Sequence, residues 1–354
     1  MDSIPLLSVV VLGFLFALIN GFHDGGNVIA TVVSSRSLPP ARALLYACVA
    51  EFLGPLSLGT AVAVTVGMEI FDPLLVTSGD AERLGMLLSS ALISAIVWDL
   101  FTWWVGMPTS SSHALVGGMV GAGIATSGTR IIIWDTLVLK AVLPLLITPI
   151  IGIGAGYAAM RIAVFLFRNA HPRINLMFKR VQAVTSVFLA GSHGANDAQK
   201  SMGLIAMMLF GCDSLISFEV PGWVAIGCAG AMALGVSLGG WRIIRTMGTG
   251  IFKVQALHSF NAQLTAGSVI FASGFIGLPV STTQIVGSTI MGVGAGDRFR
   301  EVRWVVAKDV LVAWLTTIPA SAMLGAFTYL LVASLCKMDG RSLELIIESL
   351  GSSF

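Results

Sequence analysis

Charged side chains are scarce in this sequence, and that scarcity excludes a soluble protein. Only 11% of the 354 residues are charged, whereas a soluble domain carries about 25%. Several windows of about 20 residues hold almost no charge, which is enough to span a bilayer as an α-helix. The short alternating segments typical of a membrane β-barrel are absent. The sequence therefore predicts an all-α polytopic protein in the lipid bilayer of the cell membrane.

Other features are missing as well. The formal net charge is only +2, and no basic run interleaved with aromatic residues indicates a nucleic-acid partner. The cysteines at positions 48, 212, 228 and 336 stand apart, without CxxC or zinc spacing, and we interpret them as small apolar helix residues. We find no nucleophile–base pair or metal cluster that would indicate an enzyme, and we expect no cofactor.

The few charged residues divide the loops between apolar segments into a basic group and an acidic group. Residues 161–180 contain five Lys or Arg and no acid, and residues 240–253 contain three more basic residues. By the positive-inside bias, both stretches should face the cytoplasm. The loops near 69–82 and 213–219 are acid-rich and should face outside.

The sequence contains an internal repeat. The stretch GMPTSSSHALVG (106–117) matches GLPVSTTQIVG (277–287) at an offset of 171, then 170 after one deletion. The stretch HDGGN (23–27) matches NDAQK (196–200) at an offset of 173, and Pro149 matches Pro319 at 170. Two motifs that recur in the same order at nearly the same offset indicate a duplication.

Gly/Pro-interrupted segments at corresponding positions of two halves are typical of secondary transporters, whose site lies where the halves meet. We place a first repeat at 1–168, a basic linker at 169–180, a second repeat at 181–336 and a short tail at 337–354. Inverted repeats require an odd number of crossings each. The apolar runs of the first repeat give four, and a fifth could lie within 137–167.

Two hydroxyl-rich stretches each follow a proline: Thr109, Ser110, Ser111 and Ser112, and then Ser281, Thr282 and Thr283. Each stretch then enters a run compatible with a helix, where proline favours the first turn. Free backbone N–H groups and the positive helix end make an anion site, and hydroxyls add donors without charge. Two such turns could hold one tetrahedral oxyanion. The alternative is that these residues only satisfy kinked backbone.

Two carboxylates lie inside apolar surroundings, Asp24 near Asn27 and Asp197 beside Asn196. A charge at that depth costs several kcal/mol unless it is paired. Oxygen ligands of this kind suit a hard cation such as sodium, and unwound backbone carbonyls could complete its shell. The alternative is a structural pair between an Asp and Lys200, or a Lys200 that balances charge near the anion.

The motifs SHGANDAQKSMG, WDLFTWWVGMPTSSSHALVGG and GLPVSTTQ resemble the signatures of the inorganic phosphate transporter (PiT) family, over nearly the whole chain. The resemblance implies two inverted repeats with broken helices and two re-entrant hairpins, near 106–126 and 277–296. It also implies phosphate transport with sodium or protons, and a homodimer. Its polar motif residues fall on Asp24, Asn27, Asn196, Asp197 and Lys200, and its hairpin hydroxyls on Ser110, Ser111, Ser112, Ser281, Thr282 and Thr283.

The chain departs from the family pattern at two places. Gln284 stands where the family often has His, and Gly21-Phe22-His23-Asp24 stands where it often has Gly-Ala-Asn-Asp. A neutral Gln cannot titrate, which favours sodium over proton coupling. Glu51 and His113 have no assigned role, since each could be functional or simply paired.

The sequence as a whole predicts a sodium-coupled phosphate symporter. The alternative is a proton-coupled phosphate or sulfate permease of the same family. An anion channel is disfavoured, because it needs no carboxylates beside its anion site. We predict phosphate ligands at Ser110, Ser111, Ser112, Ser281, Thr282, Thr283, Asn196 and Lys200, and sodium ligands at Asp24, Asn27, Asn196 and Asp197.

Overall fold

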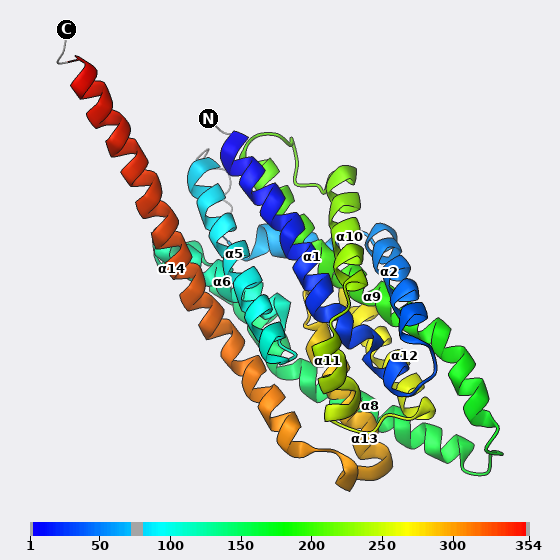
Figure 1. Ribbon diagram of the computed structural model, residues 1–354. Coiled ribbons are helices and arrows are strands. Elements are labelled where there is room, and N and C mark those ends of the chain that lie inside the picture. Colours follow the sequence, from blue (N-terminus) through cyan, green and yellow to red (C-terminus); the bar gives the residue numbers. More distant parts are fainter. Residues whose placement is uncertain (1–2, 72–80, 352–354) are drawn as a thin grey trace.

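The computed structural model describes residues 3–71 and 81–351, and nearly all of them are helical. The start of α1 and the end of α14 lie at one end of a helical bundle, and the α8–α9 connection lies at the opposite end (Figure 1). We call these the terminal end and the basic end. The basic end takes its name from Lys179 and Lys253, which belong to the two basic stretches and line one cavity there.

The two halves of the chain contain corresponding elements in the same order, with the single helix α14 of the second half in the place of α7, η3 and α8 of the first. The first half consists of α1 (Ser3–Ser34), α2 (Pro40–Ser57), α3 (Ala61–Val64), η1 (Thr65–Glu69), α5 (Ala81–Val105), α6 (Ser111–Ser127), η2 (Thr129–Ile131), α7 (Trp134–Leu137), η3 (Val138–Val142) and α8 (Leu143–Phe167). The second consists of α9 (Ile174–Gly211), α10 (Gly222–Ser237), α11 (Trp241–Arg245), η4 (Thr246–Gly250), α12 (Ala256–Phe275), α13 (Thr282–Arg298), η5 (Phe299–Glu301) and α14 (Trp304–Gly351).

Several elements are long and apolar enough to cross a membrane. Within the described residues, four helical segments meet this criterion alone: Ile4–Ser34, Ala81–Val105, Leu146–Phe167 and Trp304–Leu335. Two bent pairs meet it together, α2 with α3–η1 and α10 with α11–η4. These lengths and compositions confirm the prediction of a polytopic membrane protein.

The bent pairs are the predicted broken helices. The first pair bends by 70° and the second by 62°. Each break contains a glycine in the left-handed region, Gly59 at φ 76° and Gly239 at φ 66°, a conformation that other residues adopt with strain. At the first break, the side chain of Gln199 accepts hydrogen bonds from Val62 N (2.9 Å) and Ala63 N (3.3 Å). Backbone donors freed by the break are thereby satisfied.

The first hairpin, formed by α5 and α6, enters from the terminal end. Ser8 on α1 contacts Ser89 near the start of α5, and His23 contacts Thr102 near its end, so the two helices run in the same direction. After a turn at residues 106–110, α6 runs back until Arg83 donates to the carbonyl of Thr126 (3.0 Å). The turn, or hairpin tip, is therefore deep inside the bundle.

The second hairpin, formed by α12 and α13, enters from the basic end. Gln255, which caps α12, lines the same cavity as Lys179, and His258 Nε2 lies 3.0 Å from Asp297 Oδ2 at the base of the hairpin. Its tip, residues 276–281, packs against the first bend at Ala61. The first tip contacts the second bend, where Thr246 donates to the carbonyl of Gly106 (3.0 Å). Hairpins that enter from opposite ends confirm the inverted repeat.

The two repeats are interlocked rather than adjacent. Helix α1 packs on α10 and α2 packs on α9, while α8 covers α13 and α14 covers α6. Small residues allow this close approach. A Cβ added at Gly121 on α6, for example, would lie 1.8 Å from the carbonyl oxygen of Ala322 on α14.

The structure corrects one expectation. Helices α1 and α9 continue through 23–27 and 196–200, so the expected unwound carbonyls are not present there. The helices stay intact because the polar side chains find hydrogen-bond partners on other elements. In the first half, α1, the bent pair of α2 with α3–η1, α5 and Leu146–Phe167 are long and apolar enough to cross, which agrees with the four runs counted from the sequence, and η3 continues directly into α8. Residues 174–180 begin α9 and residues 337–351 continue α14, while the division into a linker at 169–180 and a tail at 337–354 stays a prediction.

The distribution of charge agrees with the predicted grouping of the loops. The basic stretches 161–180 and 240–253 come together at the basic end. Of the acid-rich stretch 69–82, residues 72–80 lie outside the described residues, and Glu69 contacts Lys140. That the basic end faces the cytoplasm stays a prediction.

The packing of α6 on α14 predicts a position-specific effect of glycine substitution. Gly121→Ala should lower the free energy of unfolding by about 1–3 kcal/mol, because the new methyl group overlaps a backbone carbonyl. Gly230→Ala on α10 is the matched control, since nothing lies within 4 Å of its added Cβ. Thermal unfolding in detergent measures both variants. Equal stabilities of the two would contradict the described interface.

Candidate functional site

The two hairpin tips meet in the interior of the bundle. Ser110 and Ser281 are the N-caps of α6 and α13, and their side chains accept hydrogen bonds from His113 N (3.3 Å) and Gln284 N (3.2 Å). Ser112 donates to the carbonyl of Val280 in the opposite tip (3.2 Å). The positive ends of two helices of 17 residues therefore face the same buried region.

Asp24 on α1 is the first carboxylate in this region. It accepts hydrogen bonds from Ser111 of the first tip (2.7 Å) and Thr283 of the second (2.8 Å). His23 Nδ1 lies 2.8 Å from the same carboxylate. Asn27, one turn along α1, donates to Asp24 (3.2 Å) and to Thr283 (2.9 Å). A single carboxylate thus joins both repeats.

Asp197 on α9 is the second carboxylate. It accepts a hydrogen bond from Thr282 (3.0 Å) and pairs with the ammonium of Lys200. Lys200 also donates to Ser112 and, at 3.4 Å, to the carbonyl of Val280. The Asp–Lys pair considered from the sequence therefore exists, within one helix, and Lys200 links it to both tips.

The two halves of the site are related by the internal repeat. Ser111 donates to Asp24 as Thr282 donates to Asp197. Asn27 contacts Thr283 as Lys200 contacts Ser112. The main chemical difference is that a neutral amide occupies the first position and an ammonium the second. The site is thus a pseudo-symmetric pair of carboxylates with one permanent cation.

The arrangement of ligand atoms is suited to a cation. Atoms of Asp24, His193 and Asp197 all lie within 4.8 Å of one another, and all three residues are buried. His193 also contacts Glu51, with Nδ1 2.7 Å from Oε1. Glu51, whose role the sequence left open, is therefore paired with a buried base. Carboxylates this close in a medium of low dielectric require positive charge between or beside them.

Most of the predicted site residues lie in one network: Asp24, Asn27, Asp197, Lys200, Ser111, Ser112, Thr282 and Thr283. Three others lie at its edge. Ser110 and Ser281 are engaged as caps, and Asn196 donates to the carbonyl of Leu278 (3.1 Å). The ligand roles of all these residues stay predictions.

Sequence reasoning assigned no site role to several residues in or beside the network. Asn20 accepts a hydrogen bond from Ser111 (2.8 Å), and an offset of 173 relates it to His193, so the repeat itself could have indicated both. Asp99 is fully buried, and neither carboxylate oxygen has a hydrogen-bond partner among the described residues. His113, also unassigned from the sequence, lies buried in the first turn of α6, with no partner for Nδ1 in the described structure.

Inverted repeats, broken spans and a buried charged site between two hairpins define the architecture of a secondary transporter. The model of the phosphate transporter family matches residues 20–173 and 163–325, one match for each repeat, and the chain belongs to this family. Membership makes it a membrane transport protein and not an enzyme.

Similar proteins support this assignment. A probable low-affinity inorganic phosphate transporter of Bacillus subtilis (strain 168) is 40% identical over 94% of this chain and 99% of its own length. A protein of the same description from Rhizobium meliloti (strain 1021) is 41% identical over 92% and 96%. A solved structure titled "The sodium-dependent phosphate transporter" has a TM-score of 0.83 at 24% identity, over 93% of this chain and 99% of that one. The last comparison shows the fold.

Proposed function

We propose that this protein takes up inorganic phosphate by symport with sodium. Phosphate binds between the two hairpin tips, and sodium binds at Asp24 and Asp197. One observation carries the proposal: the hydroxyls best placed to hold an anion donate their protons to the carboxylates best placed to hold a cation. Phosphate and sodium would therefore bind through the same set of side chains, so that binding of one changes the hydrogen bonds open to the other.

This sharing gives a physical mechanism of coupling. A sodium ion at Asp24 takes up carboxylate oxygens that now accept from Ser111 and Thr283. The released hydroxyls then point their protons toward an anion between the tips. Without the cation, phosphate would face the carboxylate of Asp24, and two such negative charges 4 Å apart repel each other by about 4 kcal/mol in partly shielded surroundings. Sodium thereby raises the affinity for phosphate, and by linkage phosphate raises the affinity for sodium to the same extent.

Lys200 has a similar double use on the second side of the site. Its ammonium pairs with Asp197 and contacts Ser112 of the first tip. When a cation takes over Asp197, the ammonium becomes available to phosphate as a charge-assisted donor. Asn27, near Asp24, contributes an amide group as a sodium ligand. Asn196, beside Asp197, contributes an amide group as a ligand of both sodium and phosphate.

Sodium is favoured over protons on two grounds. The site offers hard oxygen ligands, and the similar solved structure is named as sodium-dependent. A proton-coupled permease for phosphate or sulfate is the second candidate, because buried Glu51 and Asp99 lie near the network and could carry protons. The homodimer implied by the family resemblance stays a prediction.

Purified protein in proteoliposomes tests the proposed function. An inward sodium gradient should drive concentrative uptake of labelled phosphate, with arsenate competing and sulfate competing weakly. A pH gradient without sodium should drive none. Concentrative uptake from the pH gradient alone would overturn sodium coupling, and stronger uptake of sulfate would overturn the substrate. Flux that never exceeds equilibrium would indicate a channel.

The shared site predicts the effect of removing hydroxyls. Ser111→Ala and Thr282→Ala should each weaken phosphate binding by about 1 kcal/mol, the net value of one hydrogen bond. Ser90→Ala is the control, because this buried hydroxyl has no hydrogen-bond partner among the described residues and lies 15 residues before the end of α5 that leads into the first tip. Equilibrium binding at saturating sodium measures all three. Unchanged binding in a folded double variant would exclude a single anion site shared by the tips.

Substitution of Asp197 separates the two roles of its carboxylate. If Asp197 is a sodium ligand, Asp197→Asn should keep the fold and weaken or abolish the stimulation of phosphate binding by sodium. If it only pairs with Lys200, the same change leaves a buried ammonium unpaired, which is strongly destabilising. Asp197→Asn combined with Lys200→Met distinguishes these cases in thermal unfolding and uptake assays. Recovery of sodium-dependent transport by the double variant would contradict the ligand role.

A further inference from the structure

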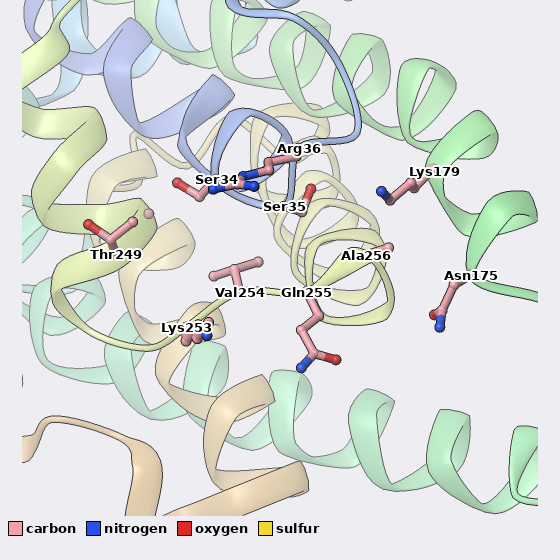
Figure 2. Close-up of a pocket in the computed structure, with 11 residues that line it drawn as sticks. Ser34, Ser35, Arg36, Asn175, Lys179, Thr249, Lys253, Val254, Gln255 and Ala256 are labelled. Atoms are coloured by element: carbon pink, nitrogen blue, oxygen red, sulfur yellow. The ribbon is translucent and has the colours of Figure 1, made fainter. Parts of the chain in front are cut away.

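A basic cavity of about 590 Å³ opens at the basic end of the bundle (Figure 2). Arg36, Lys179 and Lys253 lie on three sides of it, and the lining includes no acidic residue. None of the three has an ion pair in the described part of the chain. A concave surface with only positive charge concentrates anions.

The backbone at Arg36 gives an independent indication of function. Arg36 lies two residues beyond the end of α1 and has φ at 54°, and it is one of two non-glycine residues with positive φ among those described. Glycine is the favoured residue for this conformation at a helix end, and an arginine there is strained. An arginine thus occupies a backbone conformation that favours glycine, and its guanidinium group lines the cavity.

Buried polar side chains lead from this cavity toward the interior. Ser35, which lines the cavity, donates to Gln182 Oε1 (3.0 Å), and Gln182 Nε2 donates to the carbonyl of Ala256 (2.7 Å). These contacts join the end of α1, the second turn of α9 and the start of α12. Such uncharged side chains join packed membrane helices by hydrogen bonds, and a continuous line of them from a basic cavity also offers hydrogen-bonding groups to a polar solute.

A second set of contacts continues the line toward the transport site. Thr185 on α9 donates to Gln263 Oε1 (2.5 Å), and Gln263 Nε2 donates to Thr31 on α1 (3.2 Å). Asn27 of the proposed site lies one turn beyond Thr31 on the same helix. Together we call these two sets of contacts, formed by Ser35, Gln182, Ala256, Thr185, Gln263 and Thr31, the polar ladder.

The helices of the polar ladder also carry unsatisfied hydroxyls. Ser186 on α9 and Ser259 on α12 are fully buried, and neither hydroxyl has a hydrogen-bond partner among the described residues. Buried polar atoms are rarely left unpaired in a sealed interface. These unpaired hydroxyls favour a second conformation of the protein in which the interface between α9 and α12 admits water or a hydrated ion.

We propose that the polar ladder is the route by which phosphate reaches the cytoplasm, and that the basic cavity at its end binds a phosphate group. The inference rests on the proposed function for the direction of transport. The ligand chemistry is a phosphate group with at least one negative charge. Its source is either the released phosphate ion or the headgroup of an anionic phospholipid, because basic pockets between membrane helices on this side also suit lipid headgroups.

Phosphate exchange measured separately from each face tests the proposal. The variant is Arg36→Gln, Lys179→Gln and Lys253→Gln together, and the control is Arg161→Gln, Arg173→Gln and Arg180→Gln, three exposed bases that do not line the cavity. In phosphatidylcholine vesicles of known orientation, the variant should raise KM about tenfold from the basic end, comparable to the loss of one charge-assisted contact. KM from the terminal end should not change, nor should either KM in the control.

A second arm identifies the source of the phosphate group. If phosphatidylglycerol occupies the cavity, adding it to the vesicles should raise the basic-end KM of the wild type but not of the variant. Native mass spectrometry should then find one fewer bound phosphatidylglycerol in the variant than in the control. If the cavity holds only the transported ion, phosphatidylglycerol should affect neither measurement, while the basic-end KM of the variant remains raised.

Two outcomes would overturn the proposal: equal changes of KM at both faces, which indicate damage to the central site, or no change in KM and in lipid retention relative to the control. Exchange needs no net ion gradient, so proton coupling in place of sodium would leave the test intact. A wild type that exchanges no phosphate would overturn the proposed function instead, and lipid retention would still report on the cavity.

Discussion

The structure depends on the burial of two carboxylates at the centre of an apolar bundle. An ionised Asp in such surroundings costs several kcal/mol unless donors or cations surround it. Asp24 finds its donors on both hairpin tips, so its carboxylate can be satisfied only when the two repeats are assembled. Asp197 accepts from Thr282 and pairs with Lys200, and Lys200 in turn contacts Ser112 of the first tip. The same contacts that make the fold possible therefore create the site.

The hairpins make this arrangement possible because they bring helix starts to the interior. A continuous crossing helix has its free N–H groups at the membrane surface, whereas α6 and α13 begin at buried caps, Ser110 and Ser281. Each tip rests on a bend in the other repeat, where a break in the helix gives room. Tip and bend are thus matched features, and a movement at one has to be accommodated by the other.

The pseudo-symmetry of the site has one consequential exception. Asn27 and Lys200 occupy equivalent places, so one carboxylate is neutralised within its own helix and the other is not. This leaves the Asp24 side dependent on hydroxyls, on His23 and, in the proposed mechanism, on an added cation. The polar ladder also favours the Asn27 side of the site. It approaches the site along α1, through Thr31, and its α9 residues contact α1 and α12.

The membrane class, the duplication and most of the polar residues of the network could be predicted from the amino-acid sequence, because composition and repeated motifs are properties of the chain. The folded structure establishes which donors meet which carboxylates, since Asp24 and Thr283 are 259 residues apart in the chain. It also decided that α1 and α9 stay helical at their polar motifs, and that Glu51 pairs with His193. The partner of a side chain across the bundle depends on how the helices pack, and the local sequence does not show which distant residues come into contact.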